Sequence, residues 1–122
     1  MELKYFTLCT RNIDSEIDFC TGKLGFRVFK HTKILNQRQC TILVKDNGDK
    51  ALMLIESDDK NKAGSTVILN TDDFLKDHFE LKGVGVNFLS EPEYTMAGIA
   101  AAFEDPDGNR WVLIEERDYS AN

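Results

Sequence analysis

The chain reads F-E-D-P-D-G-N-R-W-V-L-I-E-E from Phe103 to Glu116. Its segment Asp105 to Gly108 predicts a tight turn, because proline presets φ, aspartate bonds the local backbone and glycine accepts a positive φ. Strand-like apolar runs lie on both sides of this turn, at Ile99 to Phe103 and at Trp111 to Ile114. The stretch therefore predicts an antiparallel hairpin, with Trp111 packed in the core.

Working outward from this hairpin, hydrophobic periodicity predicts further strands and two helices. The predicted strands are residues 3–10, 26–29, 40–45, 51–56, 66–70 and 86–89. The first helix begins after a cap at either Asn12 or Asp14 and closes at Gly25, and the second is Asp72 to Lys82. Residues 46–49 predict a tight turn. Residues 57–64 form a polar linker in which a dimer hinge is conceivable.

The order strand, helix, strand, strand, strand occurs twice, which indicates a duplication. Leu8-Cys9-Thr10 matches Leu69-Asn70-Thr71. Four further residues match positions 60 residues later, namely Phe19, Gly25, Phe26 and Val28 with Phe79, Gly85, Val86 and Phe88. We therefore predict an α+β fold of two βαβββ modules, about 1–57 and 65–118, within a single domain, 1–122. Two such modules would leave one concave sheet face as the default place for a ligand.

Composition excludes several classes of protein. The chain has 122 residues, 42% of them hydrophobic and 30% charged, as in an ordinary globular domain. The net charge is −6 and no basic stripe is present, so we expect no nucleic-acid partner. No apolar run suggests a membrane span or a secretory signal, which predicts a cytoplasmic protein. The three cysteines, Cys9, Cys20 and Cys40, have no C-x-x-C pair and are expected to be reduced.

Three stretches together resemble the vicinal oxygen chelate superfamily of glyoxalases, bleomycin-resistance proteins and extradiol dioxygenases. They are Asn12 to Cys20, Leu24-Gly25-Phe26 and Phe103 to Trp111. The resemblance implies a cupped mixed β-sheet with a helix packed on the outer face of each module. It also implies a homodimer, with the modules paired within one chain or swapped between two. In character the chain is closest to the metal-free, bleomycin-resistance-like branch.

Catalytic members of this superfamily bind a divalent metal through His, Gln and Glu side chains. Position by position, the resemblance places Tyr5, Leu54, Thr66 and Val112 where those ligands would be. None of these is a normal ligand for such a site. His31 and His78 lie on separate predicted elements and do not replace them. We therefore expect neither a metal nor a cofactor.

Strand alternation predicts that the concave face is lined by aromatic, aliphatic, hydroxyl and acidic side chains. These candidate ligand-binding residues are Tyr5, Thr7, Cys9, Leu54, Glu56, Thr66, Ile68, Val112 and Ile114. Small residues at 100–102 could leave room above the sheet. The lining suits a flat or amphipathic organic molecule, such as an aromatic one, and the acidic balance would favour a cationic one. The leading hypothesis is therefore a protein that sequesters a small molecule.

Two other classes of function stay open. One is an enzyme, either a metal-dependent lyase, dioxygenase or glutathione- or thiol-transferase with unexpected ligands, or a metal-free enzyme with Glu56 or Cys9 as base or nucleophile. The other is an interaction module that acts by dimerisation alone. Elemental analysis and the mass in solution would separate them from simple binding.

Overall fold

The computed structural model describes residues 1–33, 38–45, 50–58 and 66–117. Contacts divide the chain into two compact units, Met1–Ala63 and Gly64–Asn122. Each contains one helix and one sheet, which confirms an α+β fold of two modules. The turn predicted at 46–49, and residues 59–64 of the predicted linker, lie outside the described residues.

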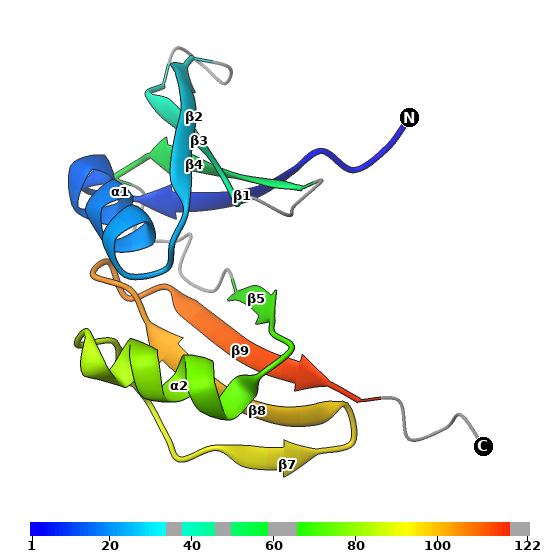
Figure 1. The fold of residues 1–122 in the computed structure, drawn as a ribbon. Helices are drawn as coiled ribbons and strands as arrows, with labels where there is room; N and C mark the ends of the chain where they lie inside the picture. Colours follow the sequence, from blue (N-terminus) through cyan, green and yellow to red (C-terminus); the bar gives the residue numbers. More distant parts are fainter. Residues whose placement is uncertain (34–37, 46–49, 59–65, 118–122) are drawn as a thin grey trace. The chain divides into compact units, whose positions relative to one another are not determined.

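Unit 1 follows the predicted order of elements. These are β1 (Tyr5–Thr10), α1 (Ile13–Gly22), β2 (Arg27–Thr32), β3 (Cys40–Val44) and β4 (Ala51–Glu56). The sheet order is β1-β4-β3-β2, so the first and last strands of the unit lie side by side (Figure 1). They run parallel, whereas the other neighbours are antiparallel.

Unit 2 repeats this plan with one additional short strand. Its elements are β5 (Thr66–Asn70), α2 (Phe74–Gly83), β6 (Asn87–Phe88), β7 (Glu93–Thr95), β8 (Gly98–Glu104) and β9 (Arg110–Glu116). The sheet order is β5-β9-β8-β6, and β7 pairs with β8 (Figure 1). No strand was predicted from the sequence where β7 lies. Neither helix of the described residues is long and apolar enough to cross a membrane.

The two helices begin with the same hydrogen bonds, which fixes how the modules align. The side chain of Asn12 accepts from Ser15 N, and that of Asp73 accepts from Lys76 N. Asn12 is therefore the cap of α1, and Asp14 lies inside its first turn. The equivalent cap residues are 61 positions apart, because 73 minus 12 is 61. Since Gly25 corresponds to Gly85 at 60 positions, unit 2 is one residue shorter after its helix.

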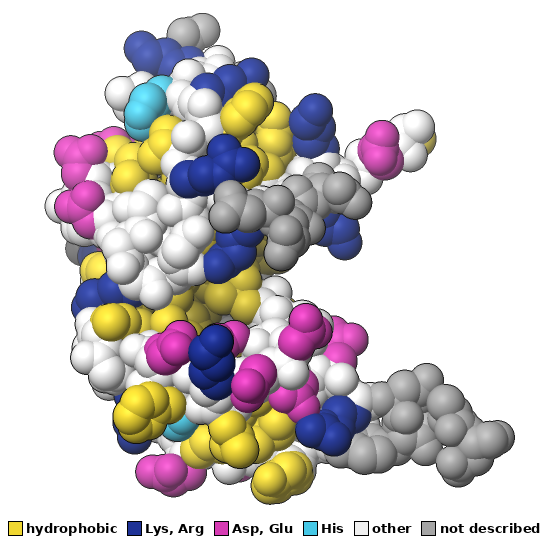
Figure 2. All heavy atoms as spheres, viewed as in Figure 1, with side chains coloured by type: hydrophobic (Ala, Val, Ile, Leu, Met, Phe, Trp, Pro, Cys, Tyr) yellow, Lys and Arg dark blue, Asp and Glu magenta, His cyan; other side chains and the backbone are white. Residues whose placement is uncertain are grey.

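This spacing corrects one match in the predicted repeat. Within the helices the offset is 61, so Phe79 corresponds to Asp18 and not to Phe19. Phe19 is only 7% exposed, whereas Phe79 is 78% exposed. In the space-filling view, hydrophobic side chains reach the surface over α2 (Figure 2). The match of Phe19 with Phe79 was wrong because one residue, a third of a helical turn, moves a side chain to another face.

Asp105 organises the turn of the predicted hairpin, which the structure confirms between β8 and β9. Its Oδ1 accepts from the backbone N–H groups of Asp107 and Asn109, at 3.0 and 2.9 Å. Its Oδ2 accepts from the indole Nε1 of Trp111 at 2.9 Å. Gly108 has a φ of +83°, as the turn requires. Trp111 is fully buried, which confirms its predicted place in the core.

A chain of ring contacts joins α2 to this hairpin. The rings of Phe74 and His78 in α2 stack with their centroids 5.3 Å apart, and the ring centroids of His78 and Phe88 are 4.4 Å apart. Phe88 contacts Phe103 at 5.4 Å, and Phe103 stacks on Trp111 at 5.9 Å. Helix α2 therefore covers the face of the sheet that carries Phe103 and Trp111.

Glu115 ties the last strand to the start of α2. Its carboxylate accepts from the backbone N–H of Phe74 at 2.9 Å and pairs with Arg117 at 2.5 Å. The hydrogen bond from Phe74 and then the bond from Arg117 lower the pKa of Glu115. A carboxylate at a helix N-terminus also meets the positive end of the helix dipole.

We predict a pH-dependent contribution of Glu115 to stability. Because its folded pKa lies below its unfolded pKa, the contribution is complete above the unfolded value and is lost as pH falls through the folded one. Urea unfolding should show Glu115→Gln less stable than the wild type at pH 7. The difference should shrink steadily below about pH 4.5. A difference that is the same at pH 7 and pH 3 would contradict this role.

Candidate functional site

The register of β1 with β4 defines one candidate surface in unit 1. Thr7 pairs with Met53 and Cys9 with Ile55, so these side chains point to the same side as Tyr5. We call this surface the Tyr5 face. Met53 and Ile55 are 5% and 3% exposed and form a cluster with Cys40 and Ile42 of β3, against which Tyr5 packs.

Helix α1 contacts β2 and β4, and we infer that it covers the opposite face of this sheet. It contacts β4, yet its buried residues Phe19 and Cys20 are absent from the cluster on the Tyr5 face. On the opposite face Leu8 pairs with Leu54, and both are fully buried. On this assignment the Tyr5 face is the one without the helix, as a candidate ligand surface requires.

Leu54 and Glu56 do not lie on the Tyr5 face, which corrects the prediction that they share it with Tyr5, Thr7 and Cys9. Leu54 pairs with Leu8, and Glu56 pairs with Thr10. The prediction was one residue out of register on β4, and a one-residue shift moves every side chain to the other face. Met53, next to Leu54 in β4, is the residue that points to the same side as Tyr5.

In unit 2 the four predicted residues do share one face. Thr66 and Ile68 of β5 point to the same side as Val112 and Ile114 of β9. Ala102 and Ala100 of β8 pair with Val112 and Ile114 and add small side chains to this surface. We call the surface formed by these six residues the Ile68 face. It is opposite the face that α2 covers, and Ile68 is 64% exposed. Whether it binds a ligand stays a prediction.

Neither histidine belongs to these faces. The Nδ1 atom of His31 lies 2.9 Å from the hydroxyl of Thr41, on the other side of the unit 1 sheet from the Tyr5 face. His78 belongs to α2 and contacts the rings of Phe74 and Phe88. Burial, and then the charge of Lys82, lower the pKa of His78, while Glu91 acts in the opposite direction. Both imidazoles therefore contact residues away from the two candidate ligand faces.

Cys9 and Cys40 lie on the same face but are separated. Both pair with Ile55, from opposite sides of β4, so their strands are two spacings or about 9.6 Å apart. A disulfide needs Cα atoms within about 7 Å, so these two cannot be bridged here. Cys9 is half-buried, and Cys20 and Cys40 are buried.

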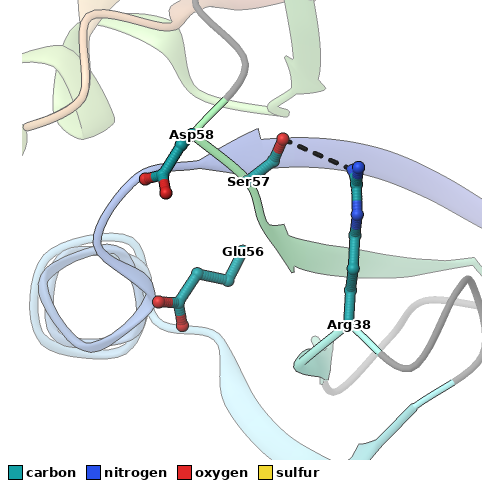
Figure 3. Close-up of a pocket in the computed structure, with 4 residues that line it drawn as sticks. All are labelled: Arg38, Glu56, Ser57 and Asp58. Atoms are coloured by element: carbon teal, nitrogen blue, oxygen red, sulfur yellow. Dashed lines mark hydrogen bonds between the residues drawn. The ribbon is translucent and has the colours of Figure 1, made fainter.

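A polar pocket at the end of β4 was not predicted. It has a volume of about 370 Å³ and is lined by Arg38, Glu56, Ser57 and Asp58 (Figure 3). The guanidinium of Arg38 donates to the hydroxyl of Ser57 at 3.4 Å. The sequence did contain a signal, since antiparallel pairing of the predicted strands 40–45 and 51–56 in this register carries residue 38 opposite residue 57.

Comparison with known proteins identifies the class to which these paired modules belong. A model of the Glyoxalase/Bleomycin resistance protein/Dioxygenase superfamily matches residues 2–113, and the chain belongs to this superfamily. An uncharacterized protein from Shewanella frigidimarina (strain NCIMB 400) is 31% identical over 125 residues, covering 93% of each chain.

Solved structures show the same fold. TnmS3, an antibiotic binding protein from Streptomyces sp. CB03234, has a TM-score of 0.82 and 24% identity, with 96% of this chain and 97% of that chain covered. A member of the superfamily from Sphaerobacter thermophilus DSM 20745 has a TM-score of 0.82 and 25% identity, with 95% and 98% covered.

The residues present do not fit the metal of the superfamily's catalytic members. With the register corrected, the four positions hold Tyr5, Met53, Thr66 and Val112, that is a phenol, a thioether, a hydroxyl and an isopropyl group. Such a set lacks the imidazoles and carboxylates that hold zinc, nickel, manganese or iron. Across 1–33, 38–45, 50–58 and 66–117, no three His, Cys, Asp or Glu side chains gather into a group that could hold a metal.

Proposed function

We propose that the protein binds a small organic molecule on its helix-free sheet faces, without a metal ion. The observation that carries this proposal is the Ile68 face. It presents Ile68 to solvent beside Val112, with the small side chains of Ala100 and Ala102 in the neighbouring strand. An apolar sheet surface that no helix of its unit covers needs an occupant, and small side chains leave room for one.

The Tyr5 face would bind ligands of the same class through hydrogen bonds and ring stacking. Tyr5 and Thr7 offer a ring and hydroxyl groups, and Tyr5 packs on the cluster that contains Met53. Such surfaces favour aromatic ligands, because rings stack on tyrosine and pack against thioethers. The net charge of −6 favours a ligand that is also cationic.

The likeness to known proteins supports the same reading. TnmS3, whose fold this chain shares, is described as an antibiotic binding protein. We propose an antibiotic-like organic compound as ligand, bound by a cytoplasmic homodimer. Mass measurement in solution should therefore give twice the mass of one chain, which is 13.9 kDa.

Thermal unfolding with a panel of compounds tests the proposal. Aromatic and cationic compounds, bleomycin among them, would be added to the wild type, to Ile68→Glu and to Leu75→Glu. Leu75 is the matched control, since it is 68% exposed but lies on α2. A ligand at a hundred times its dissociation constant stabilises by about 2.7 kcal/mol, which is a shift of roughly 10 °C.

We expect that shift in the wild type and in Leu75→Glu, and its loss in Ile68→Glu. The same shift in all three proteins would place the ligand elsewhere, and no shift with any compound would count against binding. Zinc and nickel should give no saturable heat in calorimetry. Stoichiometric binding of either metal would contradict the metal-free part of the proposal.

A further inference from the structure

The pocket at the end of β4 is separate from the Ile68 face and lies beyond the last paired residues of the Tyr5 face. All four lining residues belong to unit 1, and Ser57 points to the side of the Tyr5 face while Glu56 points to the opposite side. Arg38 is half-buried, Ser57 is nearly buried, and the two acidic residues are exposed. The volume of about 370 Å³ falls within the range of small-molecule sites.

The pairing of β3 with β4 explains why these residues meet. Cys40 pairs with Ile55, and the backbone N–H of Glu56 donates to the carbonyl of Gln39 at 3.0 Å. The pairing thus continues one step beyond β3 and brings Arg38 opposite Ser57. Because side chains alternate along an extended chain, Glu56 and Asp58 point to one side and Ser57 to the other (Figure 3).

The pocket therefore has a positive and a negative side. In Figure 3 the side chain of Arg38 extends to Ser57, while the carboxylates of Glu56 and Asp58 lie apart from each other, both on the side away from Arg38. Within the part of the chain that the structure describes, Arg38 forms no ion pair with Glu56 or Asp58, and its guanidinium donates to Ser57 instead. One guanidinium and two carboxylates are thus held apart around one hollow.

We propose that this pocket binds a dibasic amino acid, such as L-lysine or L-ornithine. The charge pattern of such a molecule, one carboxylate and two ammonium groups, is the complement of the pocket. The planar guanidinium of Arg38 suits a carboxylate, to which it can donate two hydrogen bonds. Glu56 and Asp58 accept from the ammonium groups. The flexible chain between the ligand's charged ends spans the strand end at Ser57.

This inference does not rest on the proposed function, because the pocket shares no residue with the Ile68 face, which carries that proposal. The probes also differ. Failure of aromatic compounds to bind would leave the pocket unaffected, and failure of L-lysine would leave the Ile68 face unaffected.

Titration of the ¹⁵N-labelled protein with L-lysine at constant ionic strength tests the proposal. Two comparison probes each remove one recognised group: cadaverine lacks the carboxylate, and Nε-acetyl-lysine lacks the side-chain charge. We expect saturable shifts of the amide resonances around Ser57 with L-lysine, with a dissociation constant of about 1 mM or tighter. Each comparison probe should bind at least about fivefold more weakly, because each loses a charge-assisted contact.

Variants assign the two sides of the pocket. Arg38→Gln should weaken L-lysine at least about fivefold and leave the weak binding of cadaverine unchanged. Glu56→Gln should weaken both. Lys76→Gln and Glu80→Gln remove the same charges from exposed positions on α2 and should change neither. Circular dichroism would confirm that each variant is folded.

Three results would overturn the proposal. One is the lack of saturable shifts with L-lysine at 50 mM, well above the expected constant of about 1 mM. Another is equal affinity for cadaverine and L-lysine, which would indicate unspecific attraction of cations to an acidic surface. The third is an unchanged affinity for L-lysine in both Arg38→Gln and Glu56→Gln.

Discussion

Asp105→Ala is expected to lower the free energy of unfolding by about 3–5 kcal/mol, which corresponds to roughly 10–20 °C in the melting temperature. The carboxylate accepts three hydrogen bonds, from two backbone N–H groups of the turn and from the indole of Trp111. Its removal leaves the buried indole N–H and the N–H of Asn109 without their acceptor. An unsatisfied buried donor costs more than the lost bond itself.

Two further variants make this prediction specific, with stability measured by urea unfolding. Asp105→Asn keeps an acceptor for the turn but loses the negative charge and the second oxygen, which accepts from the indole N–H, so we expect a loss of about half that size. Asp72→Ala removes a carboxylate from an exposed position before α2 and should change stability by less than about 0.5 kcal/mol. A loss below about 1 kcal/mol for Asp105→Ala would show that the turn forms without this network.

The sequence was sufficient for this hairpin because its determinants are local. Asp105 to Gly108 contains the turn residues, and the apolar runs on both sides have the composition of strands. The burial of Trp111 also followed from alternation along one strand. The same local reasoning located both helices, whose caps at Asn12 and Asp73 use residues that favour this position.

Register between distant strands was much less accessible. In unit 2 the alternation along β5 and β9 placed Thr66, Ile68, Val112 and Ile114 on one face correctly. In unit 1 the same reasoning put Leu54 beside Tyr5, although Thr7 pairs with Met53. The segment Leu52 to Ile55 is apolar at every position, so no alternation of apolar and polar residues shows which side chains face the core. The pairing with the neighbouring strand then decides which side chains share a face.

The pocket at Arg38 shows a second limit of the same kind. Arg38 is isolated in the sequence from Glu56 and Asp58, and only the pairing of β3 with β4 brings them together. Charged residues that gather through tertiary pairing leave no periodic pattern along the chain. The residues that form this pocket could therefore be identified only once the strand register was known.

The corrected register can be tested by comparing Leu54 with Ile68, both of which the sequence placed on one ligand-binding face. Leu54 is fully buried against Leu8, whereas Ile68 is 64% exposed. Leu54→Glu is expected to prevent folding, because an unpaired carboxylate would be buried beneath α1. Leu54→Ala should cost about 2–5 kcal/mol and so gives a measurable value.

Ile68→Ala and Ile68→Glu should each change stability by less than about 1 kcal/mol, since an exposed side chain has little burial to lose. Urea unfolding followed by the fluorescence of Trp111 would measure Leu54→Ala and the two Ile68 variants. If Leu54→Ala cost less than about 1 kcal/mol, Leu54 would not lie in the core, and the assignment of Met53 to the Tyr5 face would be wrong. A large loss for Leu54→Ala beside a small one for Ile68→Ala would instead separate a core residue from a surface available to a ligand.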